Sequence, residues 1–168
     1  MVHDNPMNRI YLRHAYETAM HYSQDPNTQV GAILVHDELG IVSTGANRLC
    51  NRIKETPDKL EYPQKTLYME HAERNAIFLA AERGASTKNL IMYCPWFACV
   101  ECSKAIIQSG IKKVVGHKEI HDITPKRWKE SIEQGHNLLR EAGIELELWS
   151  GKIGNSVVVQ FNGQEFRP

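Results

Sequence analysis

Beyond residue 90, short apolar runs alternate with segments that end at a glycine. The apolar runs begin at Leu90, Val114 and Ile144, and the segments between them end at Gly110 and Gly143. Glycine is favoured just past a helix because it adopts the left-handed conformation without strain. Strands that alternate with helices imply right-handed crossovers and helices on both faces of a sheet. This pattern predicts an α/β fold.

The first half of the chain adds a helix and a hairpin. Asn5 is a suitable N-cap for a first helix that ends near Ser23, because apolar residues follow it at helical spacing. Apolar runs over residues 30–35 and from Ile41 predict a hairpin of two largely buried strands. A further helix is expected from about His71. We therefore expect a three-layer α/β/α sandwich around a central mixed sheet of about five strands.

Length and charge limit the function. The 168 residues, 42% of them hydrophobic, suit a single domain over residues 1–168. Twenty Lys and Arg balance twenty Asp and Glu, so the basic field typical of a nucleic-acid-binding domain is absent. The chain also has no apolar run near the ~18 residues needed to span a membrane. We expect a cytoplasmic protein without a membrane partner, and the balanced charge argues against long duplex DNA as a partner.

Three segments give weaker signals. Residues 48–70 contain two prolines, nine charges and no sustained period, and are longer than the roughly 12 to 15 residues usual for an inert connection. We expect a functional or mobile loop there. Residues 117–122 contain two histidines and are expected to form a loop, and residues 157–161 predict one more short strand.

The chemistry-bearing residues lie at two helix starts. Cys99 and Cys102 are three residues apart, so they share a helix face, and an exposed helix N-terminus stabilises thiolates. With the imidazole of His71 they suit tetrahedral Zn²⁺, and three protein ligands leave a fourth position for water, as in a catalytic zinc site. Bound zinc lowers the pKa of that water to roughly 7. Glu73, in the first turn beside His71, is the natural proton shuttle.

Other classes of protein fit less well. Cys94, Cys99 and Cys102 have the spacing of a plant-type ferredoxin, but there the fourth ligand lies downstream, whereas Cys50 lies upstream. An iron–sulfur electron carrier would also leave Glu73 unused. The same glutamate argues against a catalytically inactive nucleotide-binding module. Each cysteine or histidine motif alone is also found in structural zinc sites.

The two motifs together resemble the signature of the zinc-dependent cytidine deaminase superfamily: His71, Ala72 and Glu73, then Cys99, Val100, Glu101 and Cys102. Residues 23–27, 29–32, 70–77 and 105–111 resemble deoxycytidylate deaminases in particular. One position departs from the family pattern, since Ala98 stands where a proline usually precedes the first cysteine. Alanine is a good helix former, so we expect this turn to persist with slightly less rigidity.

The resemblance implies hydrolytic deamination of dCMP to dUMP and ammonia with one zinc ion per chain. Glu73 would take a proton from the attacking water, deliver it to ring N3 and then protonate the departing amine. The substrate contacts it suggests are Asn47 for the sugar hydroxyl, backbone of Ala72 for the base, and the pair His121 and Asp122 near the nucleotide. Trp96 and Phe97 are candidates for the wall of the base pocket, with a place in the core as the alternative. Basic side chains of residues 48–70 are candidates for a phosphate clamp, with a solvated loop as the alternative: Arg48, Arg52, Lys54, Lys59 and Lys65.

The substrate and the regulation stay open at this point. Free cytidine or deoxycytidine, dCTP, a 5-substituted dCMP and adenosine in tRNA are alternative substrates. The resemblance also suggests a homo-oligomer, with a hexamer favoured, and dCTP and dTTP as opposing effectors. Some regulated relatives have glycines where this chain has Arg48, Leu49 and Cys50. We therefore expect weak or altered control by these triphosphates.

Overall fold

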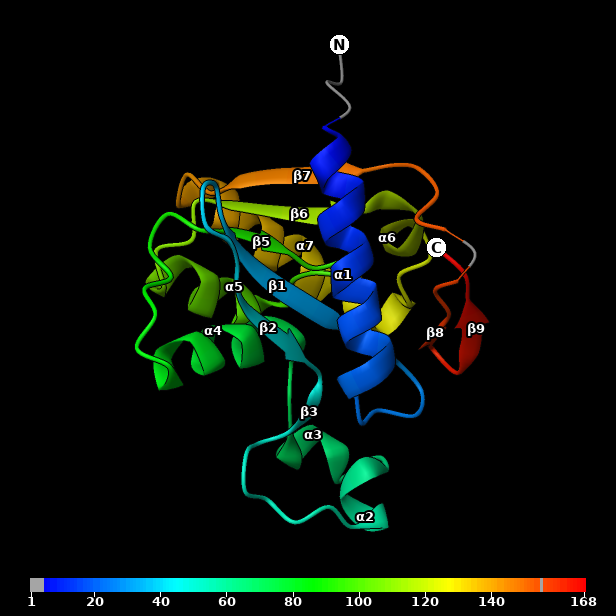
Figure 1. Cartoon of the computed structure of the whole chain (residues 1–168). Helices are drawn as coiled ribbons and strands as arrows, with labels where there is room; N and C mark the ends of the chain where they lie inside the picture. The colour runs from blue at the N-terminus through cyan, green and yellow to red at the C-terminus, as the bar shows by residue number, and fades with distance from the viewer. Residues whose placement is uncertain (1–4, 155) are drawn as a thin grey trace.

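The computed structural model describes residues 5–154 and 156–168, and its centre is a five-stranded mixed sheet (Figure 1). The strand order is β2-β1-β5-β6-β7. Strand β1 pairs antiparallel with β2 and β5, whereas β5, β6 and β7 run parallel to one another. The strands span β1 (Gly31–His36), β2 (Gly40–Ala46), β5 (Ile91–Tyr93), β6 (Lys113–His117) and β7 (Glu145–Trp149).

Helices cover both faces of this sheet. Figure 1 shows α1 (Pro6–Tyr22) in front of the sheet and α4 (Ala72–Glu82), α5 (Val100–Gln108) and α7 (Lys126–Glu141) behind it. Strand β1 alternates between two hydrophobic clusters, with Leu34 in the cluster of α4, α5 and α7 and Ile33 in the cluster of α1. This is the period of two that a strand covered on both sides requires. The three-layer α/β/α sandwich and its mixed five-stranded sheet are confirmed.

The helices begin and end where their residues favour it. Asn5 caps α1 by accepting a hydrogen bond from the backbone N–H of Met7 at 3.0 Å, as an N-cap side chain does. Gly110 and Gly143 follow α5 and α7 with positive φ angles of 73° and 76°, which glycine adopts without strain. No described helix combines the length and apolar character needed to cross a bilayer.

Two local expectations need correction. Residues 118–122, expected as a loop, form the short helix α6 (Lys118–Asp122), because the chain turns directly from β6 against the sheet and buries Ile120. The C-terminal tail forms a hairpin of β8 (Val159–Phe161) and β9 (Gln164–Phe166) in place of one strand, and its Phe161 packs in the cluster of α1.

The segment 48–70 is partly ordered into short elements. Strands β3 (Arg48–Leu49) and β4 (Met69–Glu70) pair antiparallel at its two ends and enclose α2 (Pro57–Leu60) and α3 (Lys65–Tyr68). No sustained period marked these elements in the sequence, because each is only two to four residues long. Strand β4 leads directly into α4, so this segment borders the cavity described next.

Candidate active site

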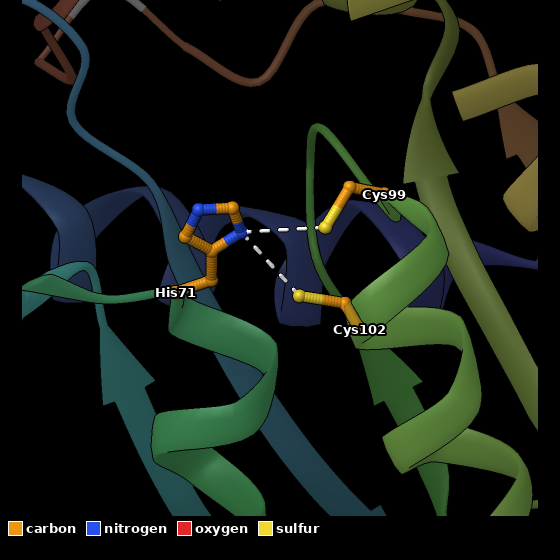
Figure 2. A group of neighbouring side chains, drawn as sticks. All are labelled: His71, Cys99 and Cys102. Atoms are coloured by element: carbon orange, nitrogen blue, oxygen red, sulfur yellow. Dashed lines mark hydrogen bonds between the residues drawn. The ribbon is translucent and has the colours of Figure 1, made fainter. Parts of the chain in front are cut away.

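Two helix starts place one histidine and two cysteines side by side (Figure 2). His71 is the N-cap residue of α4 and Cys99 that of α5, and neither side chain caps its own helix. The Nδ1 of His71 lies 3.5 Å from the Sγ of Cys99 and 3.5 Å from the Sγ of Cys102. All three ligand atoms lie within 4.8 Å of one another. Both side chains at the helix starts are therefore directed away from their helices toward a shared point.

This donor set fits a zinc ion. Tetrahedral ligands with zinc bonds of about 2.0 to 2.3 Å lie about 3.5 Å apart, which agrees with the spacing of His71 and the two sulfur atoms. Two thiolates and one imidazole are ligands that zinc prefers, and three of them leave a coordination position open. The chemistry of the donors and their separation thus both suit a catalytic zinc site.

The two thiols differ strongly in acidity. A hydrogen bond from Cys102 lowers the pKa of Cys99 to about 3. The same hydrogen bond, together with burial, raises the pKa of Cys102 well above its usual value. A metal ion must displace the remaining proton to bind both sulfur atoms as thiolates, so metal affinity rises with pH.

Glu73 is a buried carboxyl group in the first turn of α4, beside this cluster. Its side chain is only 4% exposed. Burial raises the pKa of Glu73, although the neighbouring His71 acts in the opposite direction. A carboxyl group with a raised pKa can both accept and release a proton close to neutral pH. Its position and environment suit a general acid–base residue.

A cavity of about 700 Å³ opens at the metal-ligand cluster. The buried residues Ala72 and Glu73, with His71 and Cys99, line its inner end, and the exposed residues Arg127 and Asn162 line its outer end. This volume lies within the roughly 300 to 1,000 Å³ of ordinary small-molecule sites. The cavity can hold a ligand that reaches well beyond the cluster.

Four of the expected substrate contacts line this cavity: Asn47, Ala72, Trp96 and Phe97. The Oδ1 of Asn47 accepts hydrogen bonds from Ser23 Oγ at 2.6 Å and the N–H of Val30 at 2.8 Å, and its Nδ2 donates to the carbonyl of Thr28 at 2.6 Å. One N–H of the Asn47 amide has no partner in these contacts. These contacts therefore fix the orientation of the Asn47 amide and leave one of its N–H donors available to a ligand.

Of the two expected aromatic residues, Trp96 forms part of the cavity wall, whereas Phe97 is almost completely buried. Trp96 packs edge-to-face on Trp128 at 5.9 Å between ring centroids, and both rings line the cavity. Phe97 is only 1% exposed, and its backbone is held by two histidines. His121 Nε2 accepts a hydrogen bond from the Phe97 N–H at 3.2 Å, and His136 Nε2 lies 3.1 Å from the Phe97 carbonyl oxygen. These contacts hold the turn that precedes Cys99.

The other expected contacts lie elsewhere. Among the described residues that line the cavity, Arg48, His121 and Asp122 are absent. Asp122 is exposed and pairs with Lys118 at 2.5 Å, and His121 supports the Phe97 turn from behind. Of the basic residues in segment 48–70, Lys65 alone among the described residues lines the cavity, where its ammonium group pairs with Asp25 at 2.9 Å.

Sequence reasoning missed the outer end of the cavity. Arg127, Trp128 and Asn162 line it. Trp128 also packs on the metal-ligand residue His71, at 5.9 Å between ring centroids. These residues come from α7 and from the turn between β8 and β9. No local motif marks them, because tertiary packing brings them to the cavity.

The fold and the site together define a class, the zinc-binding hydrolytic deaminases. Residues 7–118 match the family model described as the cytidine and deoxycytidylate deaminase zinc-binding region. The chain belongs to this family. The sequence resemblance to zinc-dependent deaminases is thus confirmed.

Individual relatives agree with this assignment. The chain is 33% identical to the deoxycytidylate deaminase of Mus musculus over 157 residues, which cover 87% of this chain and 81% of the mouse protein. It is 34% identical to a deaminase of the luxG 3′ region of Aliivibrio fischeri, over 74% of this chain and 82% of that protein. A crystal structure of the dCMP deaminase of cyanophage S-TIM5, in complex with dCMP and dUMP, superposes with a TM-score of 0.68 at 26% identity. That match covers 86% of this chain and 98% of the phage chain.

Proposed function

We propose that this chain is a single-domain, zinc-dependent deaminase that hydrolyses dCMP to dUMP and ammonia. The observation that carries the proposal is the buried carboxyl of Glu73 beside the cluster of His71, Cys99 and Cys102, at the inner end of a cavity of about 700 Å³. The likeness to the mouse deoxycytidylate deaminase and to the phage enzyme bound to dCMP and dUMP supports this substrate.

The proposed mechanism follows from the positions of these side chains. His71, Cys99 and Cys102 would hold the zinc ion, which supplies Lewis-acid chemistry that lowers the pKa of water to roughly 7. Glu73 accepts a proton from the water that attacks C4 and delivers it to ring N3. The same carboxylate then takes the proton of the new C4 hydroxyl and passes it to the departing amine, so that the C4 carbonyl of dUMP forms and ammonia leaves. Burial favours the neutral, proton-carrying form of Glu73 between these two transfers.

Substrate contacts follow from the lining of the cavity. Asn47 offers the remaining N–H of its amide to the sugar hydroxyl, and the backbone of Ala72 lies beside Glu73, where it can bind the base. Trp96 forms part of the base-pocket wall. Phe97 and His121 are positioning residues, because they hold the turn before Cys99.

The proposal extends to the cellular location, oligomeric state and regulation of the enzyme. Thiol ligands stay reduced in the cytoplasm, which supports a cytoplasmic location. We further propose a homo-oligomer, with a hexamer favoured, on the ground of the resemblance to deoxycytidylate deaminases. Control by dCTP and dTTP should be weak or altered, since Arg48, Leu49 and Cys50 replace the glycines of some regulated relatives.

The test is ammonia release, together with the ultraviolet change from cytosine to uracil, measured with dCMP and the Glu73→Gln variant. Loss of the carboxyl should lower kcat by at least about 10²- to 10⁴-fold, the usual span for general acid–base catalysis, while zinc content stays near one ion per chain. Cys99→Ala should instead lose the zinc. Cys50→Ala is the matched control, because Cys50 is an exposed thiol outside the cluster.

The possible results of this assay test the substrate assignment and the catalytic mechanism separately. The panel includes CMP, dCTP, deoxycytidine and 5-methyl-dCMP, and the proposal requires that dCMP be turned over best. A zinc-loaded protein that acts on none of them would contradict the substrate assignment and direct the next assay to adenosine in RNA. An active Glu73→Gln variant would contradict the mechanism.

A further inference from the structure

Among the described residues that line the cavity, Arg127 is the one cation whose charge no acidic group neutralises. Three basic side chains line it: Lys65, Arg74 and Arg127. Lys65 pairs with Asp25, and Arg74 forms a short ion pair with Glu70. Within the described part of the chain, Arg127 makes no ion pair with a carboxylate. An unneutralised cation in a cavity wall favours a ligand that carries negative charge.

Arg127, which is exposed, is held at the outer end of the cavity by one neutral group. Its Nη2 donates a hydrogen bond to Oδ1 of Asn162 at 2.9 Å. Asn162 lies in the β8–β9 turn with a positive φ of 52°, and its backbone N–H donates to Thr28 Oγ1 at 3.1 Å. The guanidinium group has five N–H donors, so most of them stay available after this contact. The hydrogen bond therefore orients Arg127 without using its charge.

The same turn joins three segments of the chain at this end of the cavity. The N–H of Gly163 donates to the carbonyl of Asn27 at 2.8 Å, and Asn27, Thr28, Asn162 and Gly163 all line the cavity. Arg127 directly precedes Trp128, whose ring packs on His71. The cation therefore belongs to the wall of the cavity that contains Glu73, at the end formed by the hairpin.

We propose that Arg127, oriented by Asn162, binds the 5′-phosphate of the substrate and so selects a nucleotide over a nucleoside. This inference rests on the proposed deamination of dCMP, and it moves phosphate recognition from the basic side chains of segment 48–70 to α7. An arginine binds phosphate through two parallel N–H···O hydrogen bonds, a geometry that a lysine cannot reproduce. Asn162 is a positioning residue for this contact.

The test compares dCMP with deoxycytidine in the zinc-loaded full chain. For Arg127→Gln, the ratio of kcat/KM for dCMP to that for deoxycytidine should fall about 10- to 100-fold, mainly through a higher KM for dCMP. Arg127→Lys should restore only part of this ratio. Lys129→Gln is the matched control, because Lys129 is an exposed cation of the same helix outside the cavity. It should leave the ratio unchanged.

Binding gives a second readout that does not depend on turnover. Isothermal titration with dUMP and with deoxyuridine should show that Arg127→Gln weakens dUMP binding about 10- to 100-fold and removes most of its preference over deoxyuridine. If Arg127→Gln changes neither the ratio of kcat/KM for dCMP to that for deoxycytidine nor the affinity for dUMP, the inference is overturned. The deaminase proposal would remain intact in that case. An equal fall in kcat/KM for dCMP and for deoxycytidine would also overturn the inference, because that result indicates a structural defect. Failure of the wild-type protein to deaminate any substrate would contradict the proposed function instead.

Discussion

Gly135 couples the packing of α7 to the position of Cys99, one of the proposed metal ligands. It is buried on α7 against the turn that leads into α5. A methyl group at this position would meet Oγ of Ser103 at 2.6 Å and the carbonyl carbon of Cys99 at 3.2 Å, and it would lie closer still to the carbonyl oxygen of Ala98. The contact with Ser103 is about 0.8 Å shorter than the 3.4 Å at which ordinary contact begins. In Gly135→Ala, either α7 or the cysteine turn must therefore move.

Two opposing effects set the magnitude for Gly135→Ala. Alanine favours a helix by up to about 1 kcal/mol over glycine. Overpacking a buried site typically costs about 1 to 3 kcal/mol, and the cost should lie at the upper end because two of the three close groups are backbone. We expect a net loss of about 1 to 2 kcal/mol in the free energy of unfolding. Displacement of Cys99 by nearly 1 Å should lower kcat about 10- to 100-fold, since misplacement by 1 Å can cost 10²-fold.

The assay for Gly135→Ala combines urea unfolding, zinc content and kcat for dCMP. Gln134→Ala is the control, because Gln134 is exposed on the same helix and its replacement changes helix propensity without entering the α5 contact. We expect Gln134→Ala to leave kcat and zinc content unchanged. A Gly135→Ala protein that is more stable than wild type, with kcat within twofold, would show that α7 accommodates the methyl group and would refute the argument.

Two further predictions concern groups around the cavity. Lys65→Met should raise the KM for dCMP several-fold with little change in kcat, because the ion pair with Asp25 holds segment 48–70 against the cavity wall. Steady-state kinetics would test this, with Lys54→Met, at an exposed position, as the control. An unchanged KM in Lys65→Met would contradict the prediction. Burial lowers the pKa of His121 to about 3, so the folded protein keeps this ring neutral while the unfolded chain takes up a proton below about pH 6.5. The free energy of unfolding should therefore fall as pH decreases from 7 toward 4, by at most about 1.4 kcal/mol per pH unit from this group. Urea unfolding at pH 7, 6 and 5 should show a smaller slope for His121→Gln than for the exposed control His21→Gln, and equal slopes would contradict the assignment.

The helices, the main strands and the metal-ligand cluster were accessible from the sequence because each depends on local spacing. Asn5 marks a helix start, Gly110 and Gly143 mark helix ends, and the spacing of Cys99 and Cys102 places both on one helix face. The short elements of segment 48–70 and helix α6 were not accessible, because two to five residues carry no measurable period. Their conformations depend on what they pack against.

The outer end of the cavity shows why recognition is harder to predict than chemistry. The sequence pointed to the many basic residues of segment 48–70, but charge there is partly compensated, as in the pair of Lys65 with Asp25. Arg127 carries no motif, and it becomes notable only because the β8–β9 turn presents a neutral amide, Asn162, where a carboxylate would have neutralised it. The catalytic groups converge on one reacting centre, and in this chain they lie at two helix starts with a recognisable local spacing. A phosphate, in contrast, can be bound by any segment that folding brings to the cavity. Substrate selection can therefore differ between relatives that share the His71, Glu73, Cys99 and Cys102 pattern, and it has to be read from long-range contacts.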